Sequence, residues 1–303
     1  MRKILVGVDL STPAEVAIQH ALGLARHVGA EVVLVMATSM PDVPGYGDSG
    51  PGRGPIAAIS AALSEEARRA ATVEHAALSE LTQRYGGQGV QVSQVIVDGR
   101  ADVALPELAR TVGADLIVVG SHGRTGLTRI AMGSVAERIV RVAPCSVYVA
   151  RGEAPTAGPR HVVMGTEFEP DAAMVLGQAS ALVAKGGQLD LITCWRLVPL
   201  TGEMPMDAFA AGSLRDDVIS ELTERADALL AKVPHPDHAA TFKIAEQGAP
   251  WGLIEAATKA AADLVVVGSH GRRGLQRWVL GSVAESTVRH APCSVLVARA
   301  AVA

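Results

Sequence analysis

The residues best suited to chemistry are glycines that follow a short apolar run. After Leu116–Val119 the chain reads Gly120, two residues, Gly123, nine residues, Gly133 and Ser134, and a helical pattern follows. Glycines directly after a buried strand let backbone amides approach an anion, and the start of the next helix adds unpaired amides with positive dipole character. This order predicts a phosphate site, in which Ser134 serves as N-cap or donates its hydroxyl to a phosphate oxygen.

The array matches neither of the two commoner phosphate motifs. The dinucleotide-binding motif needs Gly-x-Gly-x-x-Gly, and the Walker loop needs a glycine followed by Lys and then Ser or Thr. A tight turn between strand and helix explains a single Gly-x-x-Gly pair equally well. The recurrence of the whole array favours the phosphate interpretation.

The array occurs twice, at a constant offset of 148 residues. The second copy has Gly268, Gly271, Gly281 and Ser282, and the segment Ala143-Pro-Cys-Ser-Val147 recurs at the same offset. This period is far longer than a solenoid repeat, so each copy is predicted to be a complete domain. We expect repeat one to span residues 1–152 and repeat two residues 160–303, with a linker rich in Pro and Gly between them.

Short apolar runs alternate with helical patterns along repeat one. The predicted strands are Ile4–Val8, Val32–Met36, Val92–Val97, Leu116–Val119 and Val147–Ala150. Strands that alternate with helices predict an α/β fold, with a parallel sheet covered by helices on both faces. Repeat two follows the same plan from about Val162.

The helices and loops of this plan have recognisable ends. Thr12 is the predicted N-cap of the first helix, with Pro13 next and Glu15 completing a capping box, and Gly29 ends the helix. Further helices are predicted over residues 56–85 and 102–112. The segment 41–55 is a predicted loop because it is rich in Gly and Pro. The segment 198–212 occupies the matching place in repeat two and is predicted to be a loop as well.

Composition limits the class of protein. The chain has 303 residues, a net charge of -4 and three Cys without paired spacing. A nucleic-acid binder needs a clustered excess of Lys and Arg, and a membrane helix needs an apolar run that this sequence lacks. We therefore expect a cytoplasmic protein that binds neither nucleic acid nor membrane, with two domains built on Val, Leu, Ile and Ala.

These motifs resemble the universal stress protein family over nearly the whole chain, as two tandem copies. The resemblance rests on Val6-Gly-Val-Asp-Leu-Ser11, the glycine array and the closing Ala-Pro-Cys-Ser-Val segment. The array is typical of the ATP-binding branch of that family. The resemblance implies two five-stranded Rossmann-like sheets of the adenine nucleotide alpha hydrolase type, paired antiparallel through their last strands, so that one chain mimics a family dimer.

The resemblance also implies a nucleotide site, with ATP or another adenine nucleotide and Mg2+ as ligands. Asp9 would lie beside the nucleoside or its metal, and Ala37 would border the base. The implied site residues of repeat one are Asp9, Ser11, Ala37, Gly120, His122, Gly123, Arg124, Gly133, Ser134 and Val135. Those of repeat two are Glu167, Gly268, His270, Gly271, Gly281, Ser282 and Val283.

Repeat two departs from the pattern at its first strand, where Glu167 stands in the place of Asp9. A longer acid keeps the charge but displaces the base or ribose. The second site is therefore expected to bind nucleotide less reliably or to select another ligand.

Four other residues invite a chemical role. His122 and His270 could act as acid or base, but a loop His beside a phosphate is more often a neutral donor or exposed. Cys145 is expected to pack at a strand start rather than to sense redox state. Asp190 interrupts an apolar strand, and an edge position is the only explanation that the sequence offers.

The sequence is compatible with three functions. The first is an ATP-binding regulatory protein of the stress response, whose occupancy changes the two predicted loops and thereby contact with a protein partner. The second is a slow Mg2+-dependent ATPase or phosphotransfer enzyme. The third is a structural dimerisation module in which the glycines serve turns alone. The sequence leaves open whether two chains associate further.

Overall fold

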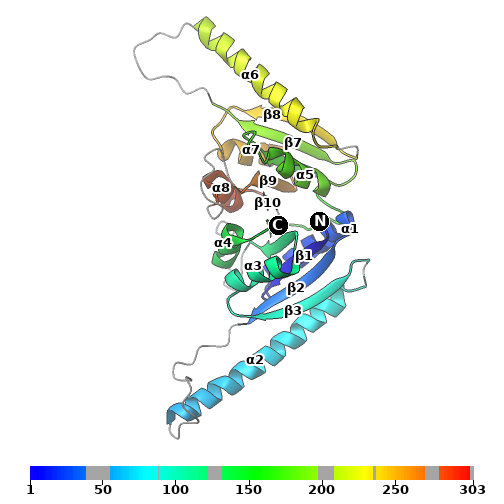
Figure 1. Cartoon of the computed structure of the whole chain (residues 1–303), viewed down its shortest axis with the longest axis vertical. Helices are drawn as coiled ribbons and strands as arrows, with labels where there is room; N and C mark the ends of the chain where they lie inside the picture. Colours follow the sequence, from blue (N-terminus) through cyan, green and yellow to red (C-terminus); the bar gives the residue numbers. More distant parts are fainter. Residues whose placement is uncertain are drawn as a thin grey trace.

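The computed structural model describes residues 1–38, 55–87, 89–121, 132–196, 208–234, 237–269 and 280–300. Strands and helices alternate along both repeats (Figure 1). Repeat one contains β1 (Lys3–Val8), α1 (Thr12–Val28), β2 (Glu31–Thr38), α2 (Pro55–Tyr85), β3 (Val92–Asp98), α3 (Ala101–Val112), β4 (Leu116–Gly120), α4 (Ser134–Val142) and β5 (Ser146–Ala150). Repeat two contains β6 (His161–Gly165), α5 (Ala172–Leu182), β7 (Gln188–Cys194), α6 (Ala208–Leu230), β8 (Ala239–Ala245), α7 (Trp251–Lys259), β9 (Leu264–Gly268), α8 (Ser282–His290) and β10 (Ser294–Ala298).

The strands form one continuous sheet in the order β3-β2-β1-β4-β5-β10-β9-β6-β7-β8. Neighbouring strands run parallel within each repeat. The exception is the junction, where β5 and β10 pair antiparallel with Tyr148 opposite Leu296. The prediction that two five-stranded parallel sheets join through their last strands is confirmed.

Helices cover both faces of the sheet, as the alternation of strands and helices predicts. One face packs under α1, α2, α5 and α6, and the other under α3, α4, α7 and α8. Strands buried on both faces must be apolar almost throughout, and every residue of β5 and of β10 is buried. Because the chain has few aromatic residues, Val, Leu, Ile and Ala fill most of this core.

The N-cap of helix α1 lies one residue earlier than predicted. Ser11, not Thr12, is the N-cap, and its hydroxyl accepts a hydrogen bond from the amide of Ala14 at 3.3 Å. The predicted capping box with Glu15 is therefore wrong, because Glu15 lies one position too far along the helix. At the other end Gly29 closes the helix in the left-handed conformation (φ 71°), as predicted.

The two predicted loops lie largely outside the described residues. Within the second, α6 already begins at Ala208, so the loop prediction is wrong for residues 208–212. Three of these five residues are alanine, and alanine has the highest helix propensity. Helices α2 and α6 stand at opposite ends of the molecule (Figure 1).

Each repeat donates an arginine to the end of a helix in the other repeat. Arg299, directly after β10, donates hydrogen bonds to the carbonyls of Ala143 at 2.6 Å and Val140 at 2.7 Å, at the end of α4. Arg151, directly after β5, donates to the carbonyl of Ala291 at 3.1 Å and to the carbonyl of Val288, at the end of α8. A cation at a helix C-terminus satisfies orphan carbonyls and opposes the helix dipole. The exchange of arginines therefore ties the repeats together.

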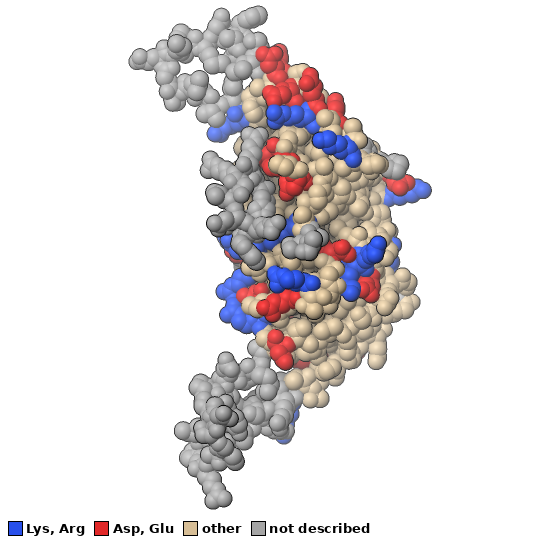
Figure 2. Space-filling view, viewed as in Figure 1, with Lys and Arg blue, Asp and Glu red and all other residues tan. Residues whose placement is uncertain are grey.

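A ring of four charged residues joins α4 and α8. Arg141 contacts Glu137 at 3.1 Å and Glu285 at 2.9 Å, and Arg289 contacts the same two carboxylates at 2.8 and 3.0 Å. Basic and acidic side chains lie interspersed around the middle of the molecule (Figure 2). Among the described residues, no helix is long and apolar enough to cross a membrane.

Candidate functional site

The candidate site lies where the strand order reverses, between β1 and β4. These strands pair in parallel with Val6 beside Val118, so their carboxyl ends leave the sheet side by side. In open α/β sheets such a switch point is the usual place for a ligand. The turn after β1 carries Asp9, and the turn after β4 leads from Gly120 toward α4.

Asp9 organises the turn between β1 and α1. Its Oδ1 atom accepts hydrogen bonds from the amide of Ser11 at 3.1 Å and from the Ser11 hydroxyl at 2.5 Å. Leu10, between them, adopts a left-handed backbone conformation with φ 60°. A left-handed leucine costs on the order of 1–3 kcal/mol and needs surrounding bonds to hold it. The sequence prediction thus places the acid correctly after β1, in a strained turn that fixes its carboxylate.

The start of α4 supplies backbone amides that no cap side chain pairs. Gly133 is the N-cap, its amide donates to the carbonyl of Ser121 at 2.8 Å, and no side chain of the cap hydrogen-bonds the first turn. The alternative that Ser134 is the N-cap is therefore wrong, because Ser134 is the first residue of the helix. Its side chain is exposed, as is that of Val135. An uncapped helix start with an exposed hydroxyl can receive an anion.

Gly120 has a packing reason to be glycine. A Cβ at this position would lie 2.6 Å from the carbonyl oxygen of Pro13, in the first turn of α1. From the sequence, the glycine is expected to allow close approach of a ligand, whereas the structure shows close approach of a helix. This contact sets how near α1 stands to the end of β4.

The remaining predicted residues of repeat one divide into described and undescribed positions. Ala37 is half-buried near the end of β2, paired with Val97 on β3. His122, Gly123 and Arg124 lie outside the described residues, as do His270 and Gly271 of repeat two. The described part of the site therefore consists of the two turns and the start of α4.

Repeat two reproduces the helix start of this arrangement. Gly281 is the N-cap of α8, and its amide donates to the carbonyl of Ser269, which follows Gly268, at 3.0 Å. Ser282 begins the helix and is exposed, and Val283 is half-buried. Ser269 and its counterpart Ser121 are not among the predicted site residues, although a serine follows the glycine in both repeats and could have indicated them.

The turn after β6 differs in chemistry from the turn after β1. Phe168 is left-handed (φ 59°) like Leu10, but α5 begins four residues after Phe168 whereas α1 begins two residues after Leu10. The amide of Glu167 donates to Oε2 of Glu169 at 3.2 Å, and Glu169 stands in the place of Ser11. Burial raises the pKa of Glu169, and the nearby charges of Glu167 and Asp171 add to the shift.

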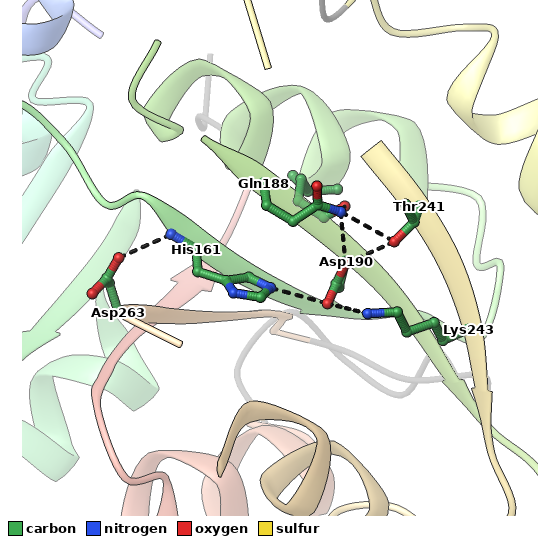
Figure 3. Close-up of polar contacts among 7 residues, drawn as sticks. His161, Gln188, Asp190, Thr241, Lys243 and Asp263 are labelled. Carbon is green, nitrogen blue, oxygen red and sulfur yellow. Dashed lines mark hydrogen bonds and ion pairs between the residues drawn. The ribbon is translucent and has the colours of Figure 1, made fainter. Parts of the chain in front are cut away.

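Asp190 forms a polar network on the sheet of repeat two (Figure 3). Its carboxylate accepts hydrogen bonds from Lys243 Nζ at 2.6 Å, Thr241 Oγ1 at 2.7 Å and Gln188 Nε2 at 2.8 Å, and lies 3.0 Å from His161 Nε2. Strand β7 has β6 and β8 as neighbours, so the predicted edge position is wrong. Asp190 is tolerated because four donors surround it, and it borders a groove of about 580 Å³ beside α7.

Two further side-chain sets bear on the sequence predictions. Burial raises the pKa of Cys145 and that of Cys293 to about 12, which keeps both thiols protonated and fits packing better than redox sensing. Among the described residues, no group of three or more His, Cys, Asp or Glu side chains is placed to hold a metal ion.

Comparison with known proteins identifies relatives over the whole chain. A protein-family model described as the Universal stress protein family matches residues 1–151 and 159–299. A universal stress protein of Mycolicibacterium smegmatis is 25% identical over 303 residues, covering 98% of this chain and 96% of the relative. One from Methanocaldococcus jannaschii is 32% identical over 150 residues, covering 50% of this chain and 82% of the relative.

A solved structure agrees with the fold. The crystal structure of a universal stress protein from Archaeoglobus fulgidus matches with a TM-score of 0.63 and 19% identity, covering 98% of each chain. At this identity the likeness concerns the fold alone. The family model, in contrast, matches both halves of the sequence. The chain therefore belongs to the universal stress protein family.

Proposed function

We propose that this chain is an ATP-binding regulatory protein of the stress response, with the nucleotide held where β1 and β4 end. The observation that carries the proposal is the start of α4, whose first-turn amides receive no hydrogen bond from the N-cap side chain. Glycine at the N-cap leaves these amides accessible to an anion, and the helix dipole favours negative charge there. A phosphate group supplies that charge.

The neighbouring turn suits the rest of a nucleotide. The Asp9 carboxylate is fixed in the turn after β1, and the resemblance to the ATP-binding branch assigns it to the nucleoside or to Mg2+. Half-buried Ala37 offers a small apolar surface for a base. Bound Mg2+ would offset the charge of the phosphates. Gly133, Ser134 and Asp9 are thus the described residues that we assign to the ligand in repeat one.

Titration calorimetry with ATP and excess Mg2+ tests the proposal. We expect binding to the wild-type chain and loss of the repeat-one site in Gly133→Val, since the new side chain fills the space in front of the helix. Gly177→Ala is the matched control, because no atom lies within 4 Å of a Cβ at that position in α5. A folded wild-type chain that shows no heat of binding with ATP, ADP or AMP would overturn the proposal.

The alternative of a slow ATPase or phosphotransfer enzyme is tested by following ADP release. It predicts continuous release that stops in Gly133→Val/Gly281→Val, in which both proposed sites are altered. Product that accumulates equally in this double variant would come from a contaminating enzyme.

A further inference from the structure

The two repeats offer a nucleotide different electrostatic surroundings at the same position of the fold. Leu10 and Phe168 share their left-handed conformation, and both turns lead into the helix that follows the first strand. The turn of repeat one contains Asp9 and the neutral Ser11, whereas that of repeat two contains Glu167 and Glu169. Asp171, the N-cap of α5, adds a third acid.

Glu169 already binds a donor at the mouth of the second site. Its carboxylate accepts from the amide of Glu167 at 3.2 Å, while its counterpart Ser11 offers a hydroxyl that caps α1. Strands β6 and β9 pair with Met164 beside Val266, so this turn leaves the sheet next to the segment that leads to α8. The half-buried carboxylate of Glu169 therefore lies in a turn whose neighbouring strand leads toward the proposed phosphate position of repeat two.

From this difference we infer that repeat two selects an adenine ligand of low charge, a nucleoside or nucleoside monophosphate, and disfavours ATP. The inference rests on the proposed function and names the ligand class of its second site. Like charges at short range in a partly buried site repel strongly, and the repulsion grows with each added phosphate. A nucleoside meets none of it.

One feature of the sequence acts in the opposite direction. Repeat two has Arg273 where repeat one has Thr125, in segments outside the described residues. Variants at Glu169 are made with that arginine present, so they isolate the effect of the carboxylate.

Calorimetry on each repeat separately tests the inference with adenosine, AMP and ATP in excess Mg2+. Repeat two is measured in a Gly133→Val background and repeat one in a Gly281→Val background. We expect repeat two to bind ATP at least about tenfold more weakly than adenosine, and repeat one to show no such penalty. Glu169→Gln, which keeps the shape and removes the charge, should remove most of the penalty. Ser11→Glu should introduce a similar penalty in repeat one.

The outcomes separate the inference from the proposed function. Binding of ATP to repeat two as tightly as adenosine overturns the inference, as does a Glu169→Gln variant that shifts both affinities equally. Binding of ATP to repeat one with no adenine ligand at repeat two also overturns it, while the proposed function stands. If neither repeat binds any of the three ligands, the proposed function fails as well. Glu169→Ser, which restores the residue of repeat one, gives a second variant should Glu169→Gln fold poorly.

Discussion

At the residue scale, Asp190 shows how one copy of a duplicated fold accommodates a buried charge. A Cβ at Gly7 would contact Leu105 of α3, and a Cβ at Gly165 would contact Leu253 of α7. These matching contacts align β1 with β6. In this alignment Asp190 and Lys243 occupy the positions of Val33 and Val95. Burying a charge costs several kcal/mol unless partners compensate, and a well-packed apolar pair often serves stability better.

Replacing one partner should cost more than replacing both. Lys243→Val leaves the buried carboxylate without its cation, and we expect the free energy of unfolding to fall by about 1–2 kcal/mol, moderated because the lysine is half-exposed. Asp190→Val/Lys243→Val, which restores the residues of repeat one, should recover that loss. Urea denaturation followed by circular dichroism measures both. Equal stability of the single and double variants would contradict this account.

The same group gives repeat two an acid-sensitive component of stability. Burial acts to raise the pKa of Asp190, but hydrogen bonds from Lys243 and three other donors outweigh it, and the pKa lies well below its ordinary value. A depressed pKa adds stability above the unfolded value of about 3.9, and that stability is lost as pH falls further. Between pH 5 and 2, by urea titration, the wild type should lose stability more steeply than Asp190→Val/Lys243→Val. Parallel curves would rule this out.

Gly120 can be tested with a glycine of opposite surroundings. Gly120→Ala places a Cβ 2.6 Å from the Pro13 carbonyl oxygen, and we expect a loss of about 1–3 kcal/mol from the resulting displacement of α1. Gly177→Ala meets nothing within 4 Å inside α5 and should gain about 0.5–1 kcal/mol from helix propensity. Thermal denaturation of the two variants compares them directly. A neutral Gly120→Ala would show that the contact relaxes freely.

At the element scale, the start of α1 depends on the strained turn before it. The hydroxyl of Ser11 caps the helix and also donates to Asp9, so the cap and the acid form one hydrogen-bonded unit. Thr12 is exposed and already helical. The side chain that ends the turn therefore also begins the helix.

Two neighbouring hydroxyls make a matched pair of variants. Ser11→Ala removes the cap, and we expect the free energy of unfolding to fall by about 1 kcal/mol, whereas Thr12→Ala should change it by less than about 0.5 kcal/mol. Chemical denaturation of both variants at one pH gives the comparison. A larger loss in Thr12→Ala would restore the cap that the sequence pattern predicts.

The sequence predicts elements better than the contacts between them. The strands and the α/β alternation follow from apolar runs because both faces of each strand are buried. The starts of α4 and α8 coincide with the repeated Gly-Ser pair. The role of Gly120 could not be predicted, since it depends on the distance to another element. Lys243, the partner of Asp190, lies 53 residues away on another strand, and only the folded sheet brings them together.

At the scale of the whole molecule, the exchanged arginines make each repeat part of the other's structure. Arg299 binds carbonyls at the end of α4, and Arg151 binds carbonyls at the end of α8. Both helices also begin at a proposed phosphate site. The stability of each site therefore includes contacts made by the opposite repeat.

Removing both arginines should uncouple the repeats. In Arg151→Met/Arg299→Met we expect the thermal transition to move down by several degrees and to broaden or divide, because helix-end carbonyls of both repeats lose their donors. Differential scanning calorimetry measures this. Arg225→Met, which removes an exposed ion pair on α6, is the control and should leave the transition nearly unchanged. An unaltered single transition in the double variant would show that the sheet alone couples the repeats.

The antiparallel pairing of β5 with β10 makes the association of the two repeats independent of protein concentration. Both strands belong to one polypeptide, so their association does not weaken on dilution and needs no second molecule. Equal numbers of the two halves are present at any expression level, because one polypeptide carries both. The sheet ends at β3 and β8, and any growth by strand addition would have to start there.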